Sequence, residues 1–264
     1  MIKIPAIIVS TLMASAIVLA LMTTPQEVFA APPPVANLIA AYPDQFRRIE
    51  NNELVWSDGT RMAISDSHDD KSFDDRLDHP AISDMFSIPY RRGPASGALA
   101  FNEDPGRIRY EPLFMKMYGD CTKGEVEAHL RKVPWPTPEG MGSVLFTTVN
   151  HAADQLEAVI NELQKLPKEY TRYFIPDNGT YMCRMIAGTN RRSMHAYGAA
   201  IDINKAFGDY WRLEKSGTSP LHYRNRIPFE IVDIFERHGF IWGGKWYHYD
   251  TLHFEYRPEL LQHQ

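Results

Sequence analysis

The chain has 264 residues, of which 44% are hydrophobic and 12% aromatic, enough to bury one substantial core or two small ones. Lys and Arg number 28 against 33 Asp and Glu, which gives a formal net charge of −5. This balance provides no basic field that would attract nucleic acid or anionic lipid over a long range. The composition therefore argues against a nucleic-acid-binding protein.

The first thirty residues have the pattern of a secretory signal peptide. Lys3 supplies a positive start, residues 4–22 form an uncharged and mostly apolar run, and residues 28–30 end in a small-residue cleavage pattern. We expect cleavage after Ala30 and export to the periplasm or the cell surface. The alternative is an uncleaved N-terminal anchor, because the apolar run is near the length that spans a bilayer. No later segment approaches the length of a second membrane span, so none is expected after signal removal.

The two cysteines, Cys121 and Cys183, both lie in the exported part of the chain. An oxidising compartment would let them form a disulfide. Their separation is too long for a pair of zinc ligands in a knuckle. A disulfide and two buried thiols are the options that the sequence leaves open.

Residues 31–118 form an N-terminal extension that carries no visible catalytic motif. Three prolines at 32–34 predict a stiff spacer before the folded body. The apolar run and the Asp-Gly-Thr turn within 54–60 predict a short hairpin. Residues 67–78 are dense in charge, which indicates an exposed loop, one that could edge a binding cleft. The role of the extension is not evident from its sequence.

Residues 119–264 contain both helical and strand periodicity and are expected to form the catalytic domain. Apolar residues at helical spacing predict helices at 124–132, 144–165 and 229–238, the last ending at Gly239. Runs of β-branched and aromatic residues predict strands at 173–175, 181–186, 199–204 and 247–256. Because the two types do not alternate regularly, the pattern favours an α+β domain with a small antiparallel sheet and flanking helices.

Three residues fulfil the requirements of a catalytic zinc site, which takes three nitrogen or oxygen ligands and leaves one position for water. His195 is followed by Asp202 on a predicted strand, and Gly198 lets the backbone bend tightly between them. His253 would come from the last strand. Two imidazoles and one carboxylate could therefore converge on one metal ion.

Asp250 precedes His253 by three residues. A carboxylate close to the nucleophilic water can take its proton and later pass a proton to the leaving amine. Asp250 is therefore the candidate general acid/base. We expect it to be ionised in the resting enzyme, because a nearby cation favours the charged form.

The segments follow the pattern S-x-H-x-x-G-x-A-x-D, then W-G-G-x-W, then D-x-x-H-F-E. Over residues 140–260 the chain resembles the zinc D-alanyl-D-alanine carboxypeptidase and L-alanyl-D-glutamate endopeptidase family, which includes VanY-like enzymes. The resemblance implies an α+β fold shared with the hedgehog signalling domain, and one zinc ion bound by His195, Asp202 and His253. It also implies Asp250 as acid/base and peptidoglycan stem peptides as substrate.

The family also places an arginine before the first ligand, where it steadies the carbonyl oxygen as negative charge develops. Arg184 is the candidate for this role, and Arg191 or Arg192 could serve instead. Lys245 replaces an acidic residue that is common in the W-G-G-x-W segment. This change would alter substrate preference without touching a ligand.

Several neighbours of the motif have two interpretations. Ser193 is not in a nucleophile elbow, so it is expected to orient His195 or to cap a turn. His248 is interpreted as a cleft residue rather than a ligand, and Glu255 as a second carboxylate behind His253. Two tryptophans, Trp242 and Trp246, could line the substrate groove or pack in the core.

The sequence leaves the bond that is cut open between two types, D-alanyl-D-alanine and L-alanyl-D-glutamate. An N-terminal extension that closes one end of the cleft would favour removal of the terminal residue. A different class, a non-catalytic zinc-containing module that binds wall peptides, is the alternative function. Retention of Asp250 beside all three ligand candidates favours the enzyme.

Overall fold

The computed structural model describes residues 1, 33–68, 70–94, 99–174, 179–213 and 221–261. Apart from Met1, the predicted signal peptide and its cleavage site therefore lie outside the described residues. Within those ranges, no helix combines the length and the apolar character needed to cross a bilayer.

Short helices and small antiparallel sheets alternate irregularly along the described ranges, which confirms the α+β class. The α-helices are α1 (Pro33–Ala41), α2 (Phe73–Asp78), α3 (Glu111–Tyr118), α4 (Ala152–Leu163) and α5 (Phe229–Arg237). One sheet has the order β1–β2–β3, built from Phe46–Glu50, Glu53–Trp56 and Arg61–Ala63. A hairpin pairs β4 (Leu130–Thr137) with β5 (Gly140–Thr147). The last sheet has the order β6–β8–β7, built from Ala200–Asp202, His253–Tyr256 and Phe240–Trp242.

The sheet β6–β8–β7 positions the candidate site. Its central strand, β8, is buried along its whole length and pairs antiparallel with both neighbours. The register with β6 sets Asp202 opposite His253. Directly opposite residues in an antiparallel pair have adjacent side chains on the same face. Two candidate ligands that are 51 positions apart in the chain are thereby brought into contact.

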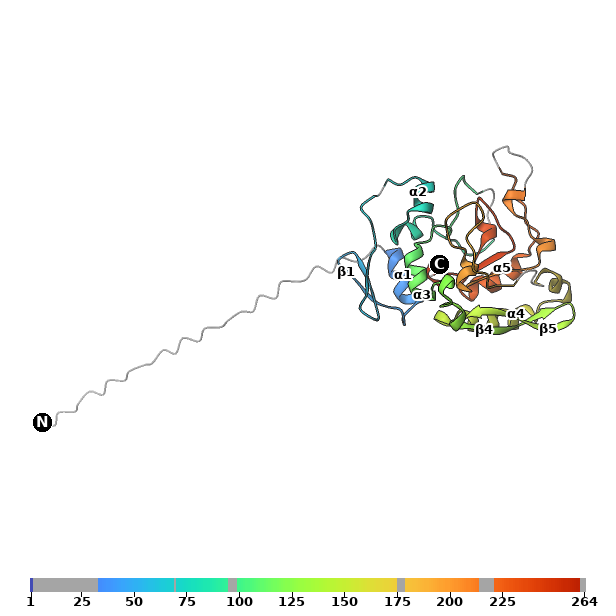
Figure 1. Ribbon diagram of the computed structural model, residues 1–264, viewed down its shortest axis with the longest axis horizontal. Helices are drawn as coiled ribbons and strands as arrows, with labels where there is room; N and C mark the ends of the chain where they lie inside the picture. The colour runs from blue at the N-terminus through green and yellow to red at the C-terminus, as the bar shows by residue number, and fades with distance from the viewer. Residues whose placement is uncertain (2–32, 69, 95–98, 175–178, 214–220, 262–264) are drawn as a thin grey trace.

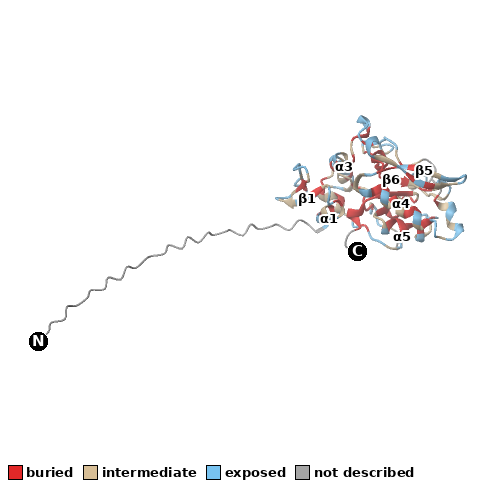
Figure 2. Cartoon of the chain, turned by 90° about the horizontal axis from the view of Figure 1, so that it is seen from below, coloured by how far each residue is buried: buried red, intermediate tan, exposed pale blue. Residues whose placement is uncertain are grey.

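One hydrophobic cluster joins the extension to the rest of the molecule. It includes Leu38 of α1 and Trp56 of β2 together with Leu156 of α4 and Phe254 of β8. In Figure 1, β1 and helices α1 to α3 lie on one side of the body, and β4, β5, α4 and α5 lie on the other. Figure 2 shows buried residues continuing across both parts. The position of a domain boundary near residue 119 stays a prediction.

The strongest local patterns produce the predicted elements. The 54–60 hairpin is confirmed, with β2 and β3 antiparallel and the Asp58 side chain accepting a hydrogen bond from the Thr60 N–H at 2.9 Å. Helix α5 confirms the prediction at 229–238, and Gly239 follows it with φ +86°. That backbone angle is accessible to glycine without steric cost, so the helix ends there.

The predicted helix at 124–132 is wrong. Gly124 adopts a left-handed φ of +74°, and only a single 3₁₀ turn at Glu127–His129 follows before β4 begins. The predicted helix at 144–165 is correct only from Ala152 onward. Its first residues belong to β5, and the left-handed angles of Asn150 and His151 separate that strand from α4. Pairing across the β4–β5 hairpin overrides the local helical pattern.

Two of the predicted strands do not form in the described residues. Tyr173 ends a 3₁₀ helix, and residue 175 lies outside the described ranges. Residues 181–186 make only one isolated bridge, between Met185 and Arg192. Their backbone instead follows the turn that carries His195, with the Met182 N–H bonded to the His195 carbonyl at 3.1 Å.

Other predicted boundaries shift for local reasons. The prediction at 199–204 corresponds to the shorter strand β6, and the prediction at 247–256 to β8 alone, because the His253 N–H bonds back to the Asp250 carbonyl in a turn. Residues 67–78 are largely exposed, but their second half forms α2, capped by Ser72. Pro33 begins α1 rather than extending a spacer, which proline can do because the first helical N–H groups lack intrahelical partners.

Cys121 and Cys183 form a disulfide, which resolves the alternative that the sequence left open. The bond joins a 3₁₀ turn after α3 to the segment beside the His195 turn. It closes a loop in which the two cysteines are 62 positions apart. The segment that contains Arg184 is therefore anchored covalently.

We expect the double replacement of Cys121 and Cys183 by serine to lower the free energy of unfolding by about 4 kcal/mol, the chain-entropy value for a loop of this length. Urea unfolding followed by tryptophan fluorescence measures the difference. Treatment with a reductant should destabilise the wild type and leave the stability of the double variant unchanged. Equal stability of the oxidised wild type and the double variant would contradict a stabilising disulfide.

Candidate metal centre

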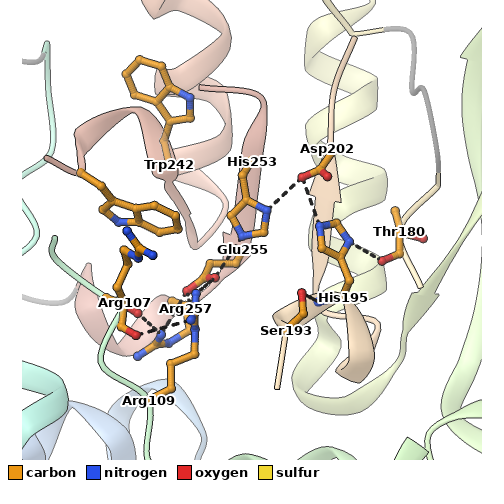
Figure 3. A network of polar contacts seen from close by, with 12 residues as sticks. Arg107, Arg109, Thr180, Ser193, His195, Asp202, Trp242, His253, Glu255 and Arg257 are labelled. Carbon is orange, nitrogen blue, oxygen red and sulfur yellow. Dashed lines mark hydrogen bonds and ion pairs between the residues drawn. The ribbon is translucent and has the colours of Figure 1, made fainter. Parts of the chain in front are cut away.

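His195, Asp202 and His253 meet around one carboxylate oxygen. The Oδ1 atom of Asp202 lies 3.1 Å from His195 Nε2 and 2.9 Å from His253 Nδ1. One ligand atom from each residue lies within 4.8 Å of the other two. Figure 3 shows both imidazoles directed at Asp202. The structure thus brings together the three residues that the sequence predicted as metal ligands.

The turn that carries His195 depends on its two ends. Ser193 caps the 3₁₀ helix Met194–Tyr197, and its Oγ accepts the His195 N–H at 3.4 Å, the capping role expected from the sequence. Gly198 ends the turn with φ +64°, and a Cβ atom there would lie 2.5 Å from Leu130 Cδ2. A side chain at this position would therefore meet both backbone strain and a steric clash.

Each histidine has a second partner that orients its ring. His195 Nδ1 lies 2.7 Å from the Thr180 carbonyl, which can accept the Nδ1–H and leaves Nε2 free to ligate a metal. His253 Nε2 lies 3.1 Å from Glu255 Oε2, which leaves Nδ1 on the side of Asp202. Partners of this kind fix the tautomer of a ligating histidine and increase its basicity.

Glu255 is itself held by two arginines. Arg109 Nη2 lies 2.5 Å from its Oε2, and Arg257 Nη1 lies 3.1 Å from its Oε1. The side chains of Glu255 and Arg257 are fully buried. Burial opposes ionisation of Glu255, but Arg109, His253 and Arg257 together hold its pKa well below its usual range. Glu255 is therefore the carboxylate behind His253 that the sequence suggested.

The donor set fits zinc. Tetrahedral ligands about 2.0–2.1 Å from zinc are separated by about 3.3 Å, close to the two distances measured from Asp202 Oδ1. Burial alone would raise the pKa of Asp202, but His195 and His253 hold it well below its usual range. The site therefore offers an ionised carboxylate between two imidazoles, a common combination for this ion.

Asp250 lies beside the cluster and is partly buried. Its backbone N–H bonds to the Gly243 carbonyl at 3.0 Å, so the glycine turn of the W-G-G-x-W segment fixes its position. Its Oδ1 atom is inaccessible to solvent and has no hydrogen-bond partner within the described ranges. Burial, opposed by His253 and reinforced by Asp202, raises the pKa of Asp250 to about 6. A carboxyl group with that pKa can exchange a proton near neutral pH.

A cavity of about 280 Å³ contains the cluster, Asp250 and three arginines. Arg184 lines it with an exposed side chain whose one described hydrogen bond goes to the Met185 carbonyl. The alternatives are engaged elsewhere: Arg191 Nη1 lies 3.3 Å from Asp78, and Arg192 Nη1 lies 2.9 Å from Asp120. Of the three arginines proposed from the sequence, Arg184 alone lines this cavity.

Arg107 and Arg109 are the charged cavity residues that sequence reasoning missed. Both belong to the N-terminal extension, outside the three motif segments. One aspartate and two arginines within 104–109 were the only signal in the sequence, and they do not identify a contact 146 positions away.

The aromatic and basic neighbours divide between the core and the cavity. Trp242 is buried, and its Nε1–H bonds to the Thr251 carbonyl at 2.8 Å, whereas Trp246 lines the cavity. His248 also lines the cavity, as the sequence suggested. Lys245 is buried, pairs with Glu236 and is not among the residues that line the cavity, so it has no direct route to a substrate there.

Comparison with known families gives one match. Residues 187–256 match a family model described as D-alanyl-D-alanine carboxypeptidase. The family resemblance is confirmed. The matched segment contains His195, Asp202, Asp250 and His253, while Arg184 and the extension lie outside it. No curated protein and no solved structure matches the chain.

Zinc binding to this candidate metal centre is expected to release a proton. Burial lowers the pKa of His253, but Asp202 and Glu255 more than offset this and raise it to about 10 in the metal-free protein. Zinc requires the neutral imidazole, so the apparent affinity should increase by up to about tenfold per pH unit between about pH 6 and 8. Calorimetric titration in buffers with different ionisation heats measures both the zinc affinity and the number of protons released.

The control is His248→Ala, which removes a cavity histidine outside the ligand cluster and should retain the same pH dependence. An affinity that does not change with pH, or binding without proton release, would contradict the role of His253.

Proposed function

We propose that the chain is a zinc-dependent peptidase that hydrolyses a bond in the peptidoglycan stem peptide, of the D-alanyl-D-alanine carboxypeptidase or the L-alanyl-D-glutamate endopeptidase type. The hedgehog-like fold that the family resemblance implies is part of this proposal. One observation carries it: a metal-competent cluster shares one cavity with Asp250, whose Oδ1 has no hydrogen bond to any described residue, and all four residues lie in the segment that matches the family model.

His195, Asp202 and His253 would hold the ion, with Thr180 and Glu255 orienting the two imidazoles. When bound, zinc polarises the scissile carbonyl and lowers the pKa of water. The side chains around the cluster would act on this polarised carbonyl and on this water.

Asp250 would take a proton from the attacking water and deliver a proton to the amine that leaves. Its ionised form is needed for the first step, and its pKa of about 6 leaves most of the population ionised at neutral pH. The bound cation would increase that fraction. Arg184 would donate N–H groups to the carbonyl oxygen as negative charge develops there. These two residues line the same cavity as the ligand cluster.

We also propose that the protein acts outside the cytoplasm, in the periplasm or at the cell surface. The N-terminal sequence supports this through its signal-peptide pattern. The disulfide supports it independently, because such bonds persist in oxidising compartments.

Replacement of Asp250 by Ala should leave zinc bound and lower kcat by about 10²- to 10⁴-fold, the usual contribution of a positioned general acid/base. The assay follows release of D-alanine or of shortened muropeptides, with bound zinc measured on the same sample. Asp233→Ala, on the exposed side of α5, is the matched control and should keep full activity. Turnover by the Asp250 variant near the wild-type rate would exclude this mechanism.

Arg184→Ala should lower kcat by about 10²- to 10³-fold with a smaller effect on KM, as expected for a donor that acts in the transition state. Arg191→Ala should have little effect, because its guanidinium pairs with Asp78 outside the metal cavity. Steady-state kinetics on the same stem peptide compares the two. The opposite ranking would transfer the role to Arg191.

Digestion of purified muropeptides by the zinc-loaded protein, with a chelator-treated control, identifies the bond. Loss of one alanine residue from a pentapeptide stem indicates carboxypeptidase action. Cleavage after the first residue of the stem, between L-alanine and D-glutamate, indicates endopeptidase action. Zinc-loaded protein that binds the stem without any change in product mass would instead indicate a non-catalytic binding module.

A further inference from the structure

The cavity that contains the metal cluster ends at two arginines of the extension. A second cavity of about 240 Å³ lies beyond it, under the end of α2. The two cavities have only Arg107 and Arg109 in common among their described lining residues. These two side chains therefore lie between the two cavities, and each is paired with a carboxylate, Arg107 with Asp104 and Arg109 with Glu255.

Arg109 is already committed to structure. Its Nη2 atom lies 2.5 Å from Glu255, and its Nε atom lies 3.4 Å from the same carboxylate. The Glu255 carboxylate in turn orients His253. Arg109 therefore supports the metal cluster from behind, and its main hydrogen-bonding edge is occupied.

Arg107 is fixed but retains free donors. Both of its described hydrogen bonds come from Nη1, one to Asp104 Oδ2 and one to the His248 carbonyl, each at 3.3 Å. Its guanidinium carbon lies 5.4 Å from the centre of the Trp246 ring, a cation–π contact that holds the plane in place. Within the described ranges, Nε and Nη2 have no partner. Those two donors form the edge that binds a carboxylate in bidentate geometry.

The support for Arg107 is itself rigid. Asp104 is fully buried and also accepts the His248 backbone N–H at 2.9 Å, and its other oxygen lies 2.6 Å from His248 Nδ1. The Trp246 Nε1–H bonds to the Pro105 carbonyl at 2.7 Å. The extension and the segment before Asp250 thus hold the guanidinium jointly, so little conformational freedom remains to be lost when an anion binds.

We propose that Arg107 binds the C-terminal carboxylate of the substrate and makes the protein a carboxypeptidase. This inference rests on the proposed function and specifies its substrate class as peptides with a free C-terminus. Arg107 lines the same cavity as the cluster, so its Nε and Nη2 donors would attract the negative C-terminal end of a substrate bound there. The partial burial of Arg107 strengthens that attraction relative to an exposed arginine.

The test compares two probes, an acetylated L-lysyl-D-alanyl-D-alanine peptide and the same peptide as its C-terminal amide. Zinc-loaded wild type should cleave the acid with a KM about 10- to 100-fold lower than that for the amide, the range expected for a charge-assisted bidentate contact. Arg107→Ala should remove this preference by raising KM for the acid, with kcat less affected. Arg107→Lys, which keeps the charge but not the fork, should give an intermediate KM.

Arg48→Ala is the matched control, because Arg48 lies on β1 in an exposed ion pair with Glu50 and should not affect the acid/amide ratio. Zinc content and melting temperature show whether the Arg107 variants are folded. A similar KM for acid and amide in the wild type, or an acid preference that survives in Arg107→Ala, would overturn the assignment. An equal loss of kcat for both probes would identify Arg107 as a transition-state donor instead, which also overturns it.

Calorimetric binding of the two probes separates this inference from the proposed function. If zinc-loaded protein cleaves neither probe but binds the acid in an Arg107-dependent manner, the carboxylate site stands and the peptidase proposal fails. If it cleaves an internal bond of a muropeptide and binds acid and amide equally, the peptidase proposal stands and the carboxylate site fails. Binding of neither probe also refutes the carboxylate site.

Discussion

The candidate site depends on one buried charge arrangement, the Asp202 carboxylate between two imidazoles. Removing a carboxylate from water is costly unless partners compensate for it, and here both partners approach the same oxygen. The pairing of β6 with β8 sets this contact, since the register places Asp202 directly opposite His253. A shift of one residue between these strands would move one ligand to the opposite face of the sheet.

The charge pattern continues from the site to the first helix. His253 contacts Glu255, which contacts Arg257, and the Nε atom of Arg257 lies 2.5 Å from Glu259. Glu259 also accepts a hydrogen bond from the Tyr42 hydroxyl at the end of α1. Alternating charges of this kind pair each buried carboxylate with a neighbouring cation. The extension is therefore part of the environment that holds the metal cluster.

Motif residues were predictable because short segments carry them. Spacing and residue type identified His195, Asp202 and His253, and Gly198 was identified from the need for a tight bend. Asp104 and Arg107 could not be found in this way, because their contacts with His248 and Trp246 arise only when distant segments pack together. A single sequence contains no local signal for such a contact.

The fold was likewise predictable where the signal is local and was missed where pairing between segments decides the structure. Helix α5 was predicted well because its apolar residues follow one helical face and a glycine ends it. The β4–β5 hairpin was missed because Pro134 and Pro136 lie in β4 and glycines occur in β5, residue types that local propensity assigns to loops. A two-stranded ribbon tolerates these prolines because one edge of each strand has no partner strand.

The β4–β5 hairpin contains no candidate ligand, yet it contacts and constrains the turn that carries His195. The Thr147 N–H bonds to the Gly198 carbonyl at 2.9 Å, and Leu130 occupies the space where a side chain at 198 would project. The distance between His195 and Asp202 is consequently set from outside by the ends of β4 and β5. Changes in this hairpin would therefore reach the candidate ligands through the backbone, although the hairpin itself supplies none of them.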